Sequence, residues 1–243
     1  MANRGVGDET YFDKWYASRT WEFYLPIIVQ IITYSKPGPI LDVGAGTGFL
    51  VECATRWGLD CEGIEGSAAA IQIACNRCAF LQLTQALLSD RFPFESGSFQ
   101  TVVMNQVIEH LEPDVARSAL RESFRVLRSD GAILVFSPSR FNSYESRADP
   151  THINMLSPAQ LRAALCEAGF RKITAMDAPL WLLGDHRIGR ALMWRIFRVT
   201  SWERLSATAN CRAYKAAGCV ASCEPQFRAS QHRVRAASRN RSH

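Results

Sequence analysis

The alternation of apolar and polar residues is clearest between residues 39 and 57. Residues 40–43 are apolar apart from Asp42, a pattern typical of a short buried strand with an acid near its carboxyl end. Three glycines follow within residues 44–48, and residues 49–57 then place apolar side chains at helical spacing. A strand, a tight glycine turn and a helix in this order predict the first unit of a doubly wound α/β fold, with the turn facing a ligand.

The rest of the chain continues this alternation of strands and helices. Further strands are expected at residues 60–65, 81–88, 101–104, 132–136 and 171–176, and at a seventh segment that opens over 205–210. Helices are expected at residues 26–34, 67–79, 113–127 and 158–169. Between them, residues 129–131 are expected to turn and residues 138–151 to form a polar loop.

Residues 8–24 are rich in aromatic side chains. Tyr11 and Trp15, like Phe12 and Tyr16, are spaced four residues apart, which predicts a short helix with its rings on one side. Two interpretations stay open, since this helix either packs on the sheet or covers the ligand site as a lid.

The glycine spacing separates two kinds of nucleotide-type ligand. A dinucleotide site has the pattern G-x-G-x-x-G, whereas this chain has Gly44-x-Gly46-x-Gly48, with Phe49 where a dinucleotide site needs a small residue. The turn is instead similar to motif I of the class I S-adenosylmethionine-dependent methyltransferases. A nicotinamide-dependent oxidoreductase is therefore the weaker alternative.

Three further stretches resemble the type 11 branch of these methyltransferases, which is related to the enzymes of quinone biosynthesis. They are residues 91–100 (RFPFESGSFQ), 105–111 (NQVIEHL) and 152–158 (HINMLSP). The resemblance implies S-adenosylmethionine as cofactor and a Rossmann-like sheet of about seven strands, the last antiparallel, with helices on both faces. It also implies that Gly44, Gly46 and Gly48 form the wall around the methionine and ribose, and that Asp42 orders this loop.

Polar residues at strand ends complete the expected cofactor site. Glu65 ends the second strand 19 residues after Gly46, where an acid accepts hydrogen bonds from ribose hydroxyls in this class of fold. Its alternative role is that of a surface acid. Asn105 and Gln106 end the fourth strand and should flank the adenosyl group, because carboxyl ends of strands face the ligand in such sheets.

The sequence departs from the family pattern at two positions. Gln100 stands where an acid is common, and Ala86 where an acid usually faces the adenine amine. These departures motivate a second hypothesis, a binding module that keeps the fold without the activity.

His110 and His152 are the candidate catalytic residues. His110 could act as a general base or only pack, and His152 lies where the family's loop borders the acceptor. No metal site is expected, because neither Cys75–Cys78 nor Cys219–Cys223 has a matching second pair of ligands.

Charge and motif content favour a small-molecule acceptor, such as a hydroxylated quinone precursor, a lipid or a sugar. The net charge of +5 arises from residues 215–243, which hold six bases and one acid, so residues 1–214 are balanced. The Asn-Pro-Pro-Tyr motif of amine methylation is missing, and nucleic acid is not an expected partner. The acceptor's identity and the oligomeric state are not predicted.

These patterns divide the chain into a helical cap (1–36), a cofactor-binding domain (37–214) and a basic, disordered tail (215–243). Residues 187–199 predict a basic amphipathic helix, which either packs on the domain or rests weakly on an anionic membrane surface. Without a leader pattern or a long apolar stretch, a cytoplasmic protein is expected.

Overall fold

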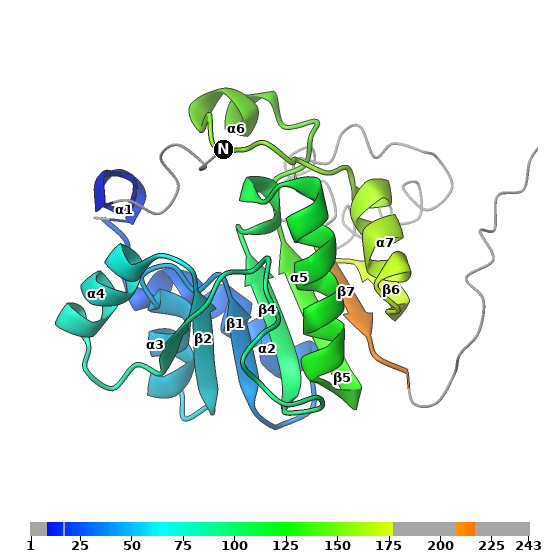
Figure 1. The fold of residues 1–243 in the computed structure, drawn as a ribbon, viewed down its shortest axis with the longest axis horizontal. Coiled ribbons are helices and arrows are strands. Elements are labelled where there is room, and N and C mark those ends of the chain that lie inside the picture. Colours follow the sequence, from blue (N-terminus) through cyan, green and yellow to red (C-terminus); the bar gives the residue numbers. More distant parts are fainter. Residues whose placement is uncertain (1–8, 17, 177–207, 217–243) are drawn as a thin grey trace, which may run out of the picture.

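The computed structural model describes residues 9–16, 18–176 and 208–216. In this part of the chain seven strands form one sheet, in the order β3-β2-β1-β4-β5-β7-β6, with helices packed around it (Figure 1). The strands are β1 (Ile40–Val43), β2 (Cys61–Glu65), β3 (Leu83–Gln85), β4 (Phe99–Asn105), β5 (Leu127–Phe136), β6 (Arg171–Ala175) and β7 (Cys211–Tyr214). The helices are α1 (Glu9–Tyr16), η1 (Trp21–Tyr24), α2 (Leu25–Tyr34), α3 (Phe49–Arg56), α4 (Ala68–Arg77), η2 (Ile108–His110), α5 (Pro113–Val126), α6 (Ser143–Ala148) and α7 (Pro158–Glu167).

The sheet is parallel from β3 to β5, and β7 runs antiparallel to both of its neighbours, β5 and β6. This topology confirms the predicted fold class. Because consecutive strand residues point to opposite faces, the central strands supply two separate cores. Leu41 and Met104 pack with residues of α5 and α7, whereas Ile40 and Val103 pack with residues of α2 and α3. Both faces of the sheet are therefore covered.

Local sequence signals explain where several helices begin. Ser67 caps α4 by accepting a hydrogen bond from the Ala70 amide. Ser157 and Gln160 form a reciprocal capping box at the start of α7, with Pro158 in the first turn. The capped ends satisfy amide groups that have no partner within the helix.

Three expected elements differ in the structure. Residues 129–131 do not separate two elements, because β5 continues through them as an irregular segment between the Leu127–Phe99 and Ala132–Thr101 pairs. The expected polar loop contains α6, which Asn142 caps by accepting a hydrogen bond from the Glu145 amide with its side chain. The seventh strand begins later than expected, since Thr208 forms only an isolated bridge with Pro138.

Two predicted segments lie outside the described residues, namely the amphipathic helix at 187–199 and nearly all of the basic tail. Lys215, at the start of the predicted tail, is anchored on the domain by hydrogen bonds from Nζ to the carbonyl oxygens of Phe124 (2.8 Å) and Leu127 (2.7 Å). None of the helices in the described ranges is long and apolar enough to cross a bilayer.

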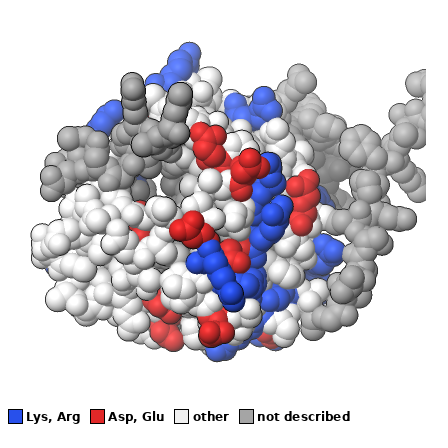
Figure 2. Space-filling model, in the orientation of Figure 1, with Lys and Arg blue, Asp and Glu red and all other residues white. Residues whose placement is uncertain are grey.

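Acidic and basic side chains lie interspersed on the face shown in Figure 2. Ion pairs on α5 join Glu122 with Arg125 and Asp114 with Arg117. This surface agrees with the balanced charge of residues 1–214.

Candidate functional site

The glycine turn joins β1 to α3 at the carboxyl edge of the sheet. Gly44, Gly46 and Gly48 all have positive φ angles, of 74°, 53° and 75°, which L-residues with a side chain rarely adopt. Gly44 has a second requirement, because a Cβ there would lie 2.6 Å from Cγ2 of Val107. The turn thus passes tightly beneath Val107, with bare backbone beside the cavity described below.

Glu65 fixes this turn from the end of β2. Its Oε2 accepts a hydrogen bond from the Gly46 amide at 2.7 Å, and its Oε1 accepts one from the Ser67 amide at 2.8 Å. The carboxylate is held by two backbone donors at known positions, and each oxygen retains a lone pair for a further hydrogen bond. It can therefore still accept from two neighbouring hydroxyl groups.

A cavity of about 470 Å³ opens over the turn. It brings together five of the predicted site residues, which are Gly44, Gly46, Glu65, Gln106 and His110. The other lining residues come from α1, from the segments after β2 and after β3, and from the stretch between β4 and the start of α5: Tyr11, Phe12, Tyr16, Gly66, Ser67, Leu87, Leu88, Ser89, Val107, Leu111 and Val115. Its size is that of a pocket for one small organic molecule.

Gln106 enters the cavity wall through an unusual backbone conformation. Its φ of 56° is in the left-handed region, and its amide donates to the Phe136 carbonyl oxygen at 2.8 Å. A left-handed conformation at a residue other than glycine carries strain that the surrounding structure must compensate, and such strain is common at binding sites.

Four predicted site residues lie outside the cavity lining. Asp42 is buried beneath the turn, where burial and the nearby Glu65 raise the pKa of its carboxyl to about 8. Gly48 begins α3 and packs near Leu81, and Asn105 is half-buried at the end of β4. His152, the fourth, lies behind His110.

The two departures from the family pattern have different positions. Gln100 lies near the amino end of β4, where its amide donates to Asp130, so it does not border the cavity. It therefore gives no reason for weak cofactor binding. Ala86 directly precedes the lining residues Leu87, Leu88 and Ser89, and its amide donates to the Glu65 carbonyl oxygen at 3.0 Å.

The aromatic helix α1 borders the same cavity. Phe12 is buried, and a Cβ on Gly46 would lie 3.6 Å from the Tyr16 hydroxyl, so α1 lies against the glycine turn. The Tyr11 hydroxyl is 3.5 Å from Nε2 of His110. Burial, and next the Asp149 charge, raise the pKa of this hydroxyl above its usual range, so Tyr11 is a neutral hydrogen-bonding group.

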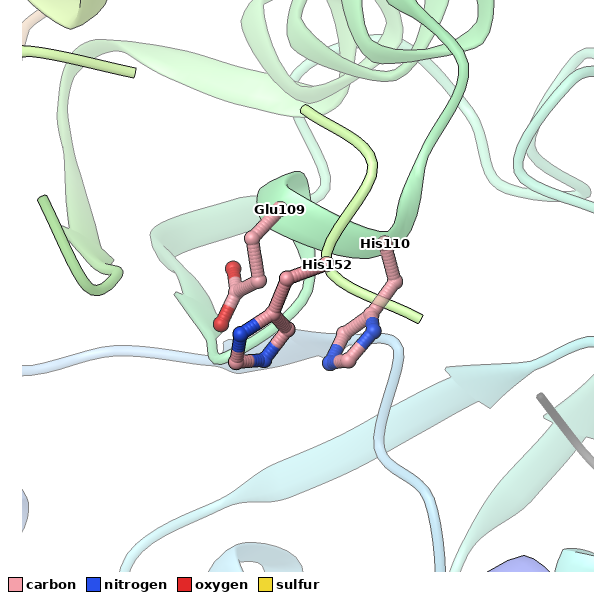
Figure 3. A group of neighbouring side chains, drawn as sticks. All are labelled: Glu109, His110 and His152. Carbon is pink, nitrogen blue, oxygen red and sulfur yellow. The ribbon is translucent and has the colours of Figure 1, made fainter. Parts of the chain in front are cut away.

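His110 and His152 lie together, with their ring centroids 4.7 Å apart. Glu109 lies beside them, and the three side chains point to the same side of the chain (Figure 3). Burial, and next the neighbouring His152, lower the pKa of His110 to about 4, so its imidazole is neutral at physiological pH. Burial raises the pKa of Glu109, which is fully inaccessible, to about 8.

Sequence reasoning missed part of this site. Glu109, Asp149 and Thr151 are not among the predicted site residues: Glu109 lies within the NQVIEHL stretch, and Asp149 and Thr151 lie in the expected polar loop. The available signal was the pairing of two polar stretches, Glu109-His110 and Asp149–His152, each next to an apolar segment. Only the fold shows that these stretches, about 40 residues apart, meet.

A second cavity, of about 430 Å³, shares Phe12 and Tyr16 with the first. Arg77 lies in its wall, donates to Oε2 of Glu52 and to the Thr47 carbonyl oxygen, and stacks 3.7 Å above the Phe49 ring. These contacts hold α4 against α3 and the glycine turn.

Comparison with known proteins identifies relatives of this chain. The profile of a methyltransferase-domain family matches residues 17–175. A demethylmenaquinone methyltransferase of Tropheryma whipplei is 36% identical over 168 residues, which are 69% of this chain and 69% of that protein. A probable S-adenosylmethionine-dependent methyltransferase of Mycobacterium tuberculosis is 33% identical over 137 residues, 54% of this chain and 48% of that protein. The chain thus spans about half the length of some relatives it matches.

Solved structures agree with the fold. The crystal structure of an S-adenosylmethionine-dependent methyltransferase from Archaeoglobus fulgidus superposes with a TM-score of 0.61, covering 85% of this chain and 98% of that one. The identity between the two is 17%, so this likeness concerns the architecture alone.

Proposed function

Because this chain belongs to the class I S-adenosylmethionine-dependent methyltransferases, we propose that it transfers the methyl group of S-adenosylmethionine to a small-molecule acceptor. The observation that carries the proposal is the Glu65–Gly46 hydrogen bond at the floor of the 470 Å³ cavity. That bond places a two-oxygen acceptor beside bare glycine backbone, which suits a ribose with two adjacent hydroxyls.

Each part of the cavity has a role in this proposal. Glu65 binds the ribose, Gly44 and Gly46 make room for the methionine part, and Gln106 flanks the adenosyl group. Gly48 and Asp42 act indirectly. Gly48 shapes the turn at the start of α3, and Asp42 supports the turn from β1 beneath it. Asn105 positions Gln106 at the end of β4.

The aromatic helix α1 is the lid in this proposal. Its Tyr11, Phe12 and Tyr16 side chains line the cavity, and aromatic ring faces attract a positive centre such as a sulfonium. A closed lid also excludes water, while alignment of the acceptor with the methyl group supplies most of the catalysis. Such alignment can lower a barrier by roughly 7–11 kcal/mol.

The acceptor's reacting atom belongs at the His110 end of the cavity. His110 borders the cavity and is neutral at physiological pH, so it can accept a hydrogen bond from a hydroxyl or bind a cation there. His152 supports it from behind. A hydroxylated quinone precursor fits this chemistry, and the balanced charge of residues 1–214 favours a small acceptor over nucleic acid.

Calorimetric titration with S-adenosylmethionine, and separately with NAD, tests the cofactor assignment. Micromolar binding of the former alone is the expected result, and binding of neither ligand would contradict the proposal. Incubation with methyl-labelled cofactor and a panel of phenols, lipids, sugars and tRNA then tests the acceptor class. Label transferred to tRNA alone would overturn the small-molecule assignment, and binding without transfer to any class would indicate a binding module.

A further inference from the structure

The side chains of Glu109, His110 and His152 form a compact group at the edge of the cavity. Glu109 and His110 belong to η2, and His152 belongs to the segment that crosses it (Figure 3). Each contributes one potential ligand atom, and the three atoms lie within 4.8 Å of one another. Two imidazoles and one carboxylate are a donor set that binds Zn²⁺ and similar divalent ions.

Polar atoms in this group lack hydrogen-bond partners. Both carboxylate oxygens of Glu109 and Nδ1 of His152 are buried and unpaired within the described part of the chain. The Ser137 hydroxyl, which faces the Glu109 carboxyl, donates instead to the Pro138 carbonyl oxygen. A buried polar group without a partner destabilises the fold, and three such atoms in one place indicate a missing partner.

A second layer of contacts orients the two rings. Nδ1 of His110 lies 3.0 Å from Oγ1 of Thr151, which in turn donates to Oδ1 of Asp149 at 2.5 Å. In this chain of bonds Nδ1 carries the proton, and the lone pair is on Nε2. Nε2 of His152 lies 3.8 Å from Oδ2 of Asp149, which leaves Nδ1 of His152 as the atom that can coordinate a metal ion. Carboxylates behind histidines play this orienting role in metal sites.

We propose that Glu109, His110 and His152 bind one divalent transition-metal ion of the Zn²⁺ class. Three protein ligands leave at least one coordination position open, as in catalytic rather than structural zinc sites. Because His110 borders the cavity, the open position faces it, on the side of the Tyr11 hydroxyl.

The role of the ion rests on the proposed methyl transfer. An acceptor hydroxyl bound at the open position loses its proton to solvent water more readily, because the ion stabilises the resulting oxyanion. A lone pair of this oxygen then forms a bond to the methyl carbon while the bond between that carbon and sulfur breaks. The electron pair of the broken bond stays on sulfur, which gives S-adenosylhomocysteine. Metal binding can be tested without knowing the methyl acceptor.

Titration of chelator-treated protein with Co²⁺ and Zn²⁺ tests the site directly. We expect one equivalent of Co²⁺ to give weak visible bands of nitrogen and oxygen coordination, Zn²⁺ to displace it, and Zn²⁺ to raise the thermal unfolding midpoint. Glu109→Gln keeps the shape of the side chain and should weaken binding by at least about 100-fold, and Asp149→Asn by roughly 10- to 100-fold. Glu95→Gln, at an exposed acid in the loop before β4, should leave binding unchanged.

Three results would overturn the proposal. They are no stoichiometric Co²⁺ or Zn²⁺ binding, unchanged binding in Glu109→Gln, or an intense near-ultraviolet thiolate band, which would assign the ion to cysteines such as the exposed Cys75. Circular dichroism and urea unfolding of the same samples verify that each variant is folded. S-adenosylmethionine titration separates the two proposals, since metal binding without cofactor binding refutes only the proposed function.

Discussion

The amide of Gly46 donates a 2.7 Å hydrogen bond to Oε2 of Glu65, across the 19 residues that separate the glycine turn from the end of β2. The parallel pairing of β1 with β2 brings these residues together, since Val43 is in register with Ile64. The bond therefore couples the shape of the turn to the position of the carboxylate.

Glu65→Ala should weaken S-adenosylmethionine binding by about 1–3 kcal/mol, because it removes both acceptor oxygens for the ribose and loosens the turn. Glu65→Gln retains one acceptor oxygen, so its affinity for S-adenosylmethionine should lie between those of Glu65→Ala and the natural protein. Titration calorimetry measures both, with Glu62→Ala on the same strand as the matched control. Equal affinity in Glu65→Ala and Glu62→Ala would remove Glu65 from the cofactor site.

Gly44→Ala should destabilise the fold more than Gly97→Ala. Both glycines have positive φ, of 74° and 77°, so both substitutions carry backbone strain of about 1–2 kcal/mol. Only at Gly44 does the new Cβ meet a neighbour, Val107, whereas nothing lies within 4 Å at Gly97. Overpacking should add roughly 1–3 kcal/mol to the loss at Gly44, measured by urea unfolding. Equal losses would show that Val107 moves aside freely.

Asp42 should make the stability of the natural protein fall with rising pH. In the folded state its carboxyl holds a proton up to a pKa of about 8, whereas an unfolded chain releases it near 3.8. The folded state thus binds more protons between these values, so this contribution is complete below pH 4 and is lost as pH rises through 8.

The Asp42→Asn side chain cannot titrate, so the variant lacks this loss of stability. As pH rises through this window, its free energy of unfolding should increase relative to that of the natural protein by up to about 1.4 kcal/mol for each pH unit. Urea unfolding at pH 5, 6.5 and 8 measures the difference, with the exposed Asp60→Asn as control. Parallel pH profiles for the natural protein and Asp42→Asn would contradict a buried, protonated Asp42.

Arg77→Ala should lower the free energy of unfolding by roughly 1.5–3 kcal/mol, because Glu52 is 4% exposed and loses a charged hydrogen-bond partner. Arg56 still pairs with Glu52, which limits the loss. Arg117→Ala removes the solvent-exposed pair with Asp114 and should cost less than about 1 kcal/mol. If the two variants unfold at the same urea concentration, the Arg77 contacts contribute little.

Local signals were enough to predict the sheet and the floor of the site. The turn at Gly44–Gly48 and the acid at Glu65 lie at strand ends, and parallel strands place their carboxyl ends at one edge, so their meeting follows from the strand order alone. Gln106 follows in the same way. The cap at Ser157 was also readable, since capping depends on neighbours within four residues.

Long-range packing decided what the sequence did not predict. The proximity of His152 to His110 depends on how the segment after β5 returns across η2, and no periodicity encodes that path. The motif around Gln100 does not show which end of β4 the residue occupies, and the fold places it at the amino end, away from the cavity. The continuation of β5 through residues 129–131 depends on its pairing with β4, which overrides a local turn preference.

Because β7 is antiparallel, the chain after it lies at the edge of the sheet opposite the cavity. The cavity opens at the carboxyl edge of the parallel strands, whereas β7 delivers the chain to Lys215 at the opposite edge, where Nζ ties it to α5 and β5. A linker attached in place of the residues after 216 would therefore leave from the far side of the sheet. Immobilising the protein on a sensor surface through that linker keeps the mouth of the cavity turned toward the flowing ligand.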